Sequence, residues 1–165
     1  MNQDAQIRLL ITGGTIDKCY NELTGELYFT QSHLPQMLKQ GHCKTNIELE
    51  TLMLKDSLEM EVTDRDIILQ ACQQSSQSLI IITHGTDTMT LTAKHLAMQI
   101  KDKTIVLLGA MVPYVFKQSD SLFNLGSAIT AVQCLSAGVY ITMNGKVFPW
   151  NQVAKNKQQG IFVRL

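Results

Sequence analysis

Two short stretches combine threonine, glycine and acidic residues in an order that could support nucleophilic chemistry. One covers residues 12–15 (Thr-Gly-Gly-Thr), and the other covers residues 83–88 (Thr-His-Gly-Thr-Asp-Thr). A threonine hydroxyl is a weak nucleophile until a nearby base takes its proton, so it needs polar helpers. Glycines permit tight turns and let a ligand approach the backbone closely. The two stretches together therefore indicate a hydroxyl nucleophile with helpers, held in glycine-containing turns.

Each stretch also has a plainer interpretation. Thr86, Asp87 and Thr88 could simply cap the helix that follows, because hydroxyl and carboxylate groups bind the free N–H groups at a helix start. Thr15 could likewise satisfy backbone groups of its own turn. A serine-type triad built on His84 has no support, since the sequence contains no G-x-S-x-G stretch to carry the nucleophile. The presence of two similar turns favours the functional interpretation.

Both stretches follow predicted strands. Residues 7–11 and 79–82 are short apolar runs rich in β-branched side chains, as expected for buried strands. Residues 89–100 then place apolar side chains on one face of a helix. Open α/β sheets bind ligands beyond the carboxyl ends of their strands, and both turns have this setting.

The rest of the chain repeats short apolar strands and amphipathic helices. This order predicts an α/β fold with a single doubly wound, mostly parallel sheet and helices on both faces, in one domain over residues 1–165. Further strands are predicted at residues 47–53, 105–108, 139–143 and 146–148, and further helices at residues 32–41, 63–72 and 122–136.

Three local features refine this prediction. Residues 17–29 lack periodicity and are expected to form a long loop or loose hairpin that acts as a lid. Thr63 and Asp66 have the spacing of a capping box at a helix start. Asn144 and Gly145 predict a tight hairpin between two strands.

The composition excludes several classes of function. Fourteen basic and fourteen acidic residues cancel, so binding of nucleic acid or a membrane surface has no electrostatic support. No apolar run approaches the length that crosses a bilayer, and the first residues do not resemble a signal peptide. The cysteines lie far apart without metal-ligand spacing, which predicts free thiols, a cytoplasmic location and no bound metal. They are Cys19, Cys43, Cys72 and Cys134.

The motifs resemble those of a known family. Residues 11–16 (Ile-Thr-Gly-Gly-Thr-Ile) are similar to the first signature of the bacterial L-asparaginases, and residues 83–89 are similar to the second. Residues 109–113, 119–125 and 143–155 are similar to further segments of the same family. The resemblance covers nearly the whole chain and corresponds to the family's N-terminal catalytic domain. It implies that domain's fold, with a flavodoxin-like strand order.

The resemblance implies a hydrolase that cleaves a side-chain amide through an acyl-enzyme. Thr15 would be the primary nucleophile, and Tyr28 on the lid would be its hydrogen-bonding partner. Thr86, Asp87 and Lys155 would form a second group, in which the lysine activates a threonine hydroxyl. Thr86 and Asp87 would also contact the substrate. The chemistry would require no metal or other cofactor.

Substrate recognition is implied for a further set of residues. Asp87 and Ser57 would hold the α-amino and α-carboxylate ends of the substrate. Leu58 would occupy a substrate-contact position where the family usually has a polar residue. Backbone N–H groups in the turns of Gly14 and Gly85 would stabilise the oxyanion, a contribution of about 3 kcal/mol per donor.

The choice of lysine has a competitor. Lys155 lies in a polar stretch, where a solvated lysine is the ordinary case, and Lys157 is only two residues away. The alignment with the family favours Lys155. To act as a base it must lose its proton, which burial favours and the charge of Asp87 opposes.

As a whole, the resemblance implies a cytoplasmic L-asparaginase that converts L-asparagine to L-aspartate and ammonia. Glutamine is an alternative substrate, since one methylene changes binding by only about 1–3 kcal/mol. The family implies a homo-oligomer, either a dimer or a tetramer. Its usual chain is longer, and its C-terminal domain helps to complete a neighbouring site, so comparable groups would come from another subunit or from the lid.

Two other functions remain open. One is a catalytically weak or silent module that binds aspartate or asparagine. The other is an amidase subunit that delivers ammonia to a partner enzyme, as part of a larger amidotransferase.

Overall fold

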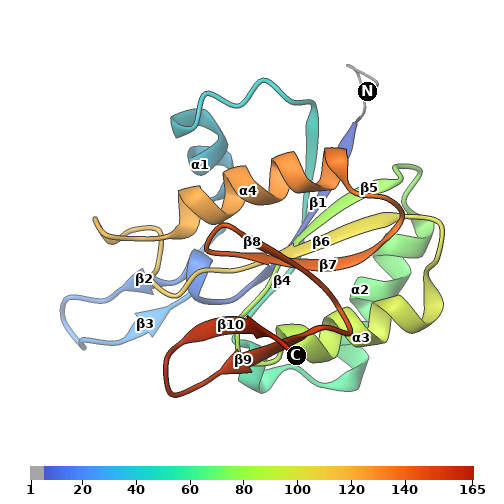
Figure 1. The fold of residues 1–165 in the computed structure, drawn as a ribbon. Coiled ribbons are helices and arrows are strands. Elements are labelled where there is room, and N and C mark those ends of the chain that lie inside the picture. Colours follow the sequence, from blue (N-terminus) through green and yellow to red (C-terminus); the bar gives the residue numbers. More distant parts are fainter. Residues whose placement is uncertain (1–5) are drawn as a thin grey trace.

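In the computed structural model, which describes residues 6–165, short runs of Ile, Leu and Val form a six-stranded mixed sheet (Figure 1). Its strands are β1 (Ile7–Gly13), β4 (Ile47–Lys55), β5 (Leu79–Thr83), β6 (Thr104–Leu108), β7 (Gly138–Met143) and β8 (Lys146–Pro149). They lie in the order β4-β1-β5-β6-β7-β8, and only β8 is antiparallel to its neighbour. Among the parallel strands, the second along the chain lies outside the first. The predicted doubly wound fold with a flavodoxin-like order is therefore confirmed.

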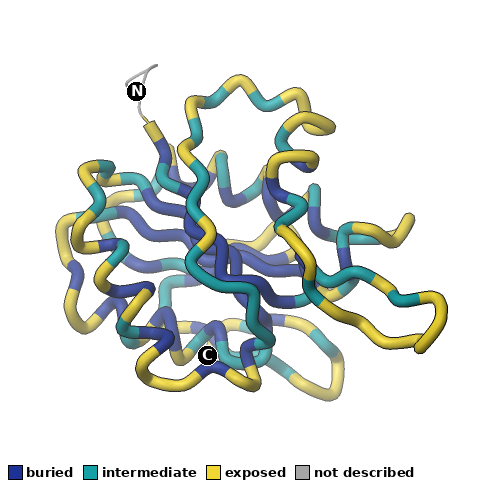
Figure 2. Tube along the Cα trace, turned by 180° about the vertical axis from the view of Figure 1, so that it is seen from behind, coloured by how far each residue is buried: buried dark blue, intermediate teal, exposed yellow. Residues whose placement is uncertain are grey.

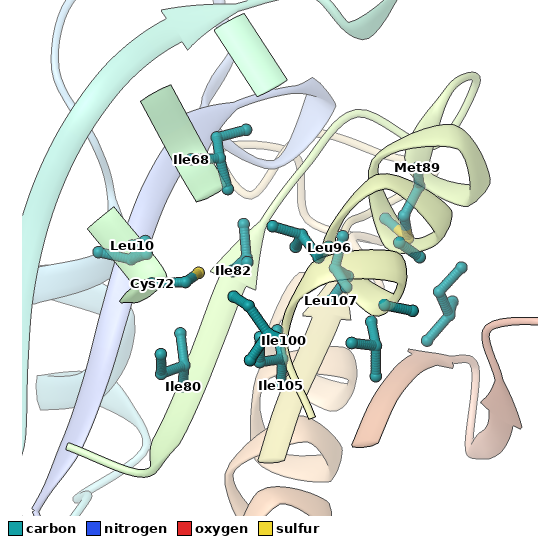
Figure 3. Packing of buried hydrophobic residues seen from close by; sticks show 14 of the residues in the cluster. Leu10, Ile68, Cys72, Ile80, Ile82, Met89, Leu96, Ile100, Ile105 and Leu107 are labelled. Carbon is teal, nitrogen blue, oxygen red and sulfur yellow. The ribbon is translucent and has the colours of Figure 1, made fainter. Parts of the chain in front are cut away.

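The alternation of side chains along each strand divides the core between the two faces of the sheet. One face packs against α2 (Val62–Gln74) and α3 (Met89–Gln99), as Figure 3 shows, and the other against α1 (Leu34–Gln40) and α4 (Ser121–Cys134). Strand residues of the first layer are Leu10, Ile80, Ile82, Ile105 and Leu107, and those of the second are Leu9, Ile11, Ile81, Val106 and Leu108. Because both faces are covered, the central strands β5 and β6 are nearly continuous apolar runs.

The start of α2 differs from the predicted capping box. The spacing of Thr63 and Asp66 indicated this role for Asp66, but the capping carboxylate comes from Asp64. Its Oδ2 accepts the backbone N–H of Glu61 at 2.9 Å. Lys55 Nζ at the end of β4 donates to Oδ1 of the same carboxylate at 2.8 Å. The prediction was wrong because α2 begins at Val62 with Glu61 as its N-cap, so Asp64 and not Asp66 occupies the third helical position.

Two small hairpins lie outside the main sheet. The lid predicted at residues 17–29 pairs β2 (Cys19–Tyr20) with β3 (Leu27–Tyr28), and Figure 2 shows it as an exposed arm. The second hairpin pairs β9 (Val153–Asn156) with β10 (Ile161–Arg164). The sequence analysis predicted no strand there, because four-residue strands with one buried apolar side chain each carry little periodicity.

Other local predictions can be compared directly with the structure. The predicted tight turn joins β7 to β8, and Asn144 and Gly145 both have positive φ, at 50° and 80°. The four cysteines are free, and burial raises the pKa of Cys72 to about 12. Within residues 6–165, no helix has the length and apolar character needed to cross a bilayer.

Candidate active site

The predicted site residues gather where three neighbouring strands end. β4, β1 and β5 are adjacent and parallel, so their carboxyl ends share one edge of the sheet. Thr15 begins a short 3-10 turn after β1, Ser57 begins another after β4, and Thr86 follows β5. The N–H of Gly14 donates to the carbonyl of Lys55 at 2.9 Å and ties the first two turns together. The sheet topology therefore brings together residues that are distant in the sequence.

Glycine is required where these turns touch one another. Gly14 has a φ of 79°, and a Cβ added there would lie 2.4 Å from the backbone nitrogen of Gly85. A Cβ added at Gly85 would lie 2.6 Å from the side chain of Ser57. Real Cβ atoms do not approach other atoms this closely, so any larger residue must displace a turn. The two glycines thus allow the three turns to pack together.

Lys155 approaches this edge from the C-terminal hairpin. Its Nζ donates to Thr86 Oγ1 and to Asp87 Oδ1, each at 2.7 Å. The Lys155 side chain is only 10% exposed, whereas Lys157 lies in the exposed turn after β9. Lys155 pairs in register with the buried Phe162 of β10. The structure therefore brings together Thr86, Asp87 and Lys155, and the lysine in this group is not Lys157.

Ser57 is hydrogen-bonded to the neighbouring turn that contains Thr88. It is 1% exposed, its Oγ accepts the N–H of Thr88 at 3.3 Å, and its carbonyl accepts the Thr88 hydroxyl at 2.8 Å. A hydroxyl that accepts one bond can still donate its own proton to a substrate. Leu58 is 68% exposed, and its backbone N–H donates to Asp56 Oδ1 at 3.0 Å.

Thr15 and Tyr28 are not joined in this conformation. Tyr28 lies opposite Cys19 in the lid hairpin and is 43% exposed. Among the described residues, no hydrogen bond links its hydroxyl to Thr15. The Thr15 side chain is partly exposed at the start of its turn. A direct contact between the two hydroxyls would require a movement of one of the side chains or of the lid hairpin.

The backbone N–H of Gly14 is also less available for binding an oxyanion than the sequence motif suggests. Its N–H is already bonded to the carbonyl of Lys55, so it is not free to bind an oxyanion. Other N–H groups of the two glycine turns would have to supply this stabilisation.

His84 has a structural environment. It is fully buried, with Nδ1 2.8 Å from the carbonyl of Gly85 and Nε2 2.7 Å from Thr92 Oγ1. Burial lowers its pKa to about 4, outweighing the opposing effect of the bond to Gly85. Arg65 Nε donates to the same Thr92 oxygen at 3.1 Å, which leaves the Thr92 proton for His84. Both ring nitrogens of His84 are thus occupied by hydrogen bonds within the protein.

Asp17 was not singled out by the sequence analysis, yet it is fully buried two residues after Thr15. Its Oδ1 accepts the hydroxyl of Ser32 at 3.0 Å and the N–H of His33 at 2.8 Å, which joins the two ends of the lid. Its Oδ2 has no partner among the described residues. Burial raises the pKa of Asp17 despite the opposing effects of these bonds and of the His33 charge. An acidic residue in a turn gives no signal of such burial in a single sequence.

A second ion pair also escaped the sequence analysis. Lys18 Nζ donates to Asp56 Oδ2, and the two side chains are 17% and 30% exposed. Burial alone would raise the pKa of Asp56. The hydrogen bonds from Lys18 and from the N–H of Leu58, with smaller contributions from the Lys18 and Lys155 charges, lower the pKa and together outweigh burial. The net pKa of Asp56 is therefore below its ordinary value. The available signal was position, since Lys18 and Asp56 lie beside the predicted Thr15 and Ser57.

Metal ligands do not gather in the part of the chain that the structure describes. Residues 6–165 contain no group of three or more His, Cys, Asp or Glu side chains arranged to hold a metal ion.

Family models and known proteins were found to match nearly the whole chain. Residues 6–161 match the family model described as asparaginase, N-terminal. The D subunit of the glutamyl-tRNA(Gln) amidotransferase from Methanococcus vannielii is 30% identical over 165 residues, covering 96% of this chain and 38% of the relative. A glutaminase-asparaginase from Acinetobacter glutaminasificans is 29% identical over 163 residues, covering 89% and 48%.

Solved structures show the same relationship. The thermostable L-asparaginase from Thermococcus kodakarensis has a TM-score of 0.85 to this chain at 26% identity. The match covers 97% of this chain and 51% of that one. The chain therefore spans about half, or less, of the length of these relatives.

Proposed function

Because the chain belongs to the asparaginase family, we propose that it is an amidohydrolase that converts L-asparagine to L-aspartate and ammonia. The observation that carries the proposal is the contact of Lys155 with both Thr86 and Asp87 at the edge of the sheet. A lysine whose side chain is 10% exposed, and whose Nζ touches a hydroxyl and a carboxylate beside two glycine turns, suits acyl transfer better than surface solvation.

The proposed reaction has two steps. In the first, the Thr15 hydroxyl attacks the side-chain carbonyl carbon, the C–N bond breaks, and ammonia leaves with the hydroxyl proton. In the second, water attacks the ester formed on Thr15 and releases L-aspartate and the free hydroxyl. Backbone N–H groups of the two turns would hold the oxyanion of each step, with a contribution of about 3 kcal/mol per donor.

Thr86 would transfer protons during these steps. Its Oγ1 accepts a bond from Lys155, so its own proton remains available for the departing nitrogen. Asp87 Oδ1 is bonded to Lys155, which leaves Oδ2 for the α-ammonium of the substrate. In this account Tyr28 reaches Thr15 only after the lid hairpin closes on the substrate. Ser57 and the adjoining Leu58 would lie at the α-carboxylate end.

The proposal is tested by ammonia release from millimolar L-asparagine and L-glutamine. We expect turnover by the wild-type protein and a loss of about 10²- to 10⁴-fold in kcat for Thr15→Ala and Thr86→Ala, as expected for lost nucleophilic and proton-transfer groups. Thr63→Ala, an exposed threonine on α2, is the matched control and should retain full activity. A folded wild-type protein that releases no ammonia, while a known asparaginase does so, would refute the proposal.

A binding module would be the better account in that case. L-Aspartate binding measured by calorimetry, without turnover and with equal affinity in Thr15→Ala, would identify such a module. Equal turnover of asparagine and glutamine would leave the amidase proposal intact and assign the protein a broader substrate range.

A second candidate is an amidase subunit that delivers ammonia to a partner enzyme. The relative at 30% identity, which is one subunit of a glutamyl-tRNA(Gln) amidotransferase, favours this possibility. Purification from the native source under mild conditions tests it. Co-purification of an amidotransferase-like partner would support this function, and a homo-oligomer without such a partner would count against it.

We further propose a cytoplasmic homo-oligomer that acts on a small-molecule amide without a metal or other cofactor. The formal charges of the whole sequence cancel, which gives no support for nucleic-acid or membrane partners.

A further inference from the structure

The Lys18–Asp56 ion pair has no part in the reaction proposed above, although it lies beside the reacting groups. The backbone N–H of Lys18 donates to the carbonyl of Thr15 at 3.2 Å, so Lys18 follows Thr15 by one 3-10 turn. Asp56 immediately precedes Ser57 at the end of β4. The pair thus joins the turn that carries the proposed nucleophile to the turn that carries a proposed substrate contact.

The Lys18 ammonium has unused hydrogen-bonding capacity. A lysine has three N–H donors, and the side-chain contacts of Lys18 are one bond to Asp56 and the face of the Phe29 ring, whose centre lies 5.7 Å from Nζ. The side chain is only 17% exposed, so its ammonium has little contact with water. A further anionic partner would therefore stabilise the charge.

Lys155, a second cation at the site, is already engaged. Lys155 directs two of its three donors to Thr86 and Asp87. Asp87 therefore remains an anionic group for a substrate ammonium, and Lys18 is a cation that keeps unused donors among the residues that the structure describes. Two lysines and two carboxylates together match a substrate that carries one positive and one negative charge.

We propose that Lys18 is a specificity-determining residue that binds the α-carboxylate of an amino-acid amide, and that Asp56 is a positioning residue for its ammonium. The inference rests on the proposed function for the identity of the amide. Its recognition step applies equally to binding of the product, L-aspartate, which provides an independent measurement.

The test compares ligands with and without the α-carboxylate. For turnover, the pair is L-asparagine and 3-aminopropanamide, and for calorimetric binding it is L-aspartate and 3-aminopropanoate. We expect Lys18→Met to lower kcat/KM for L-asparagine by about 10- to 100-fold, mostly through KM, because a charge-assisted bond is lost. The values for 3-aminopropanamide should stay within about 2-fold of wild type.

Three further variants sharpen the comparison. Lys18→Arg should recover most of the preference for the carboxylate-bearing ligand. Asp56→Asn should weaken that preference, and combining it with Lys18→Met should add little, since Asp56 acts through Lys18. Lys44→Met removes an exposed lysine elsewhere and should leave all four ligands unaffected.

The outcomes separate this inference from the proposed function. If Lys18→Met weakens both members of a ligand pair equally, Lys18 has a structural role and the inference is overturned. If the wild type binds L-aspartate without releasing ammonia, the proposed function fails, and the calorimetric pair alone decides the inference. If the wild type neither binds L-aspartate nor releases ammonia, both are overturned.

Discussion

At the scale of single residues, the protonation of Lys155 decides how the proposed chemistry can proceed. Its Nζ lies 2.7 Å from both Thr86 Oγ1 and Asp87 Oδ1. Both contacts fit a charged ammonium, which has three donors and no acceptor. In this arrangement Lys155 donates to Thr86, whose own proton is left for the substrate.

A pH effect on stability is expected from His84. Burial lowers its pKa from 6.5 to about 4 in the folded protein. Because the pKa of His84 is lower in the folded than in the unfolded protein, protonation at acidic pH favours the unfolded state. The contribution of neutral His84 to stability is therefore fully present above about pH 6.5 and is lost as the pH falls towards 4. The shift corresponds to about 3 kcal/mol. Urea denaturation across this range should show a falling free energy of unfolding.

The variant His84→Gln isolates this effect from the carboxylates that titrate over the same range. The raised pKa of Asp17 contributes with the opposite sign, since that stabilisation is lost as the pH rises. We expect His84→Gln to be less stable at neutral pH and to show a shallower decline on acidification. An equal decline in the variant and the wild type would exclude His84 as the source.

Where a motif carried the information, residues that the sequence analysis grouped lie together in the structure. The sequence analysis identified Thr86, Asp87 and Lys155 as a group, and the structure brings their side chains into contact. It did not identify Lys18 and Asp56, because each is an ordinary surface-type residue until β1 and β4 pair. Motif spacing reports on neighbours along the chain and does not show which side chains of two distant turns form an ion pair.

At the scale of elements, the glycine turns should be intolerant of substitution. Gly14→Ala would place a Cβ 2.4 Å from the nitrogen of Gly85 at a φ of 79°. We expect a loss of about 2–4 kcal/mol in the free energy of unfolding, because both the clash and the backbone strain must be relieved. Denaturant unfolding monitored by circular dichroism would measure it.

Gly126→Ala is the matched control. Gly126 lies on the exposed side of α4, and a Cβ there would meet no atom within 4 Å. Alanine should stabilise this helix position by about 0.5–1 kcal/mol. If Gly14→Ala left the free energy of unfolding as little affected as Gly126→Ala does, the close packing described for the turns would be contradicted.

Elements with a strong pattern were predictable, and those without one were not. The strand β5 consists of four consecutive apolar residues and Thr83, and it was recognised, as was α3 with its apolar face. The hairpin of β9 and β10 was missed, although it carries Lys155 to the site. Its position depends on the burial of Val153 and Phe162 against the rest of the molecule, which local sequence does not record.

At the scale of the whole molecule, the site is assembled from both ends of the chain. Figure 1 shows the C-terminal hairpin beside α3, close to the edge where the parallel strands end. Lys155 and Thr86 are 69 residues apart in the sequence, and the turn containing Thr15 comes from the first strand. The site therefore depends on the pairing of β4, β1 and β5 and on the position of this hairpin.

The proposed oligomer makes a prediction at this scale. Large apolar side chains on and beside the lid are exposed, and burying such groups favours association. They are Tyr20, Leu23, Leu27, Tyr28 and Phe116. We expect sedimentation velocity to give the mass of a dimer or tetramer. A monomer at all concentrations up to about 100 µM, well above the Kd of a stable complex, would contradict the proposal.

The most direct test of the central claim compares two lysines on the C-terminal hairpin. Ammonia release from L-asparagine should fall by at least about 100-fold in Lys155→Met, because Thr86 loses its cationic partner. Lys157→Met, which removes an exposed charge two residues away, should remain within about 2-fold of wild type. Equal activity in the two folded variants would contradict a catalytic role for the Lys155–Thr86–Asp87 group.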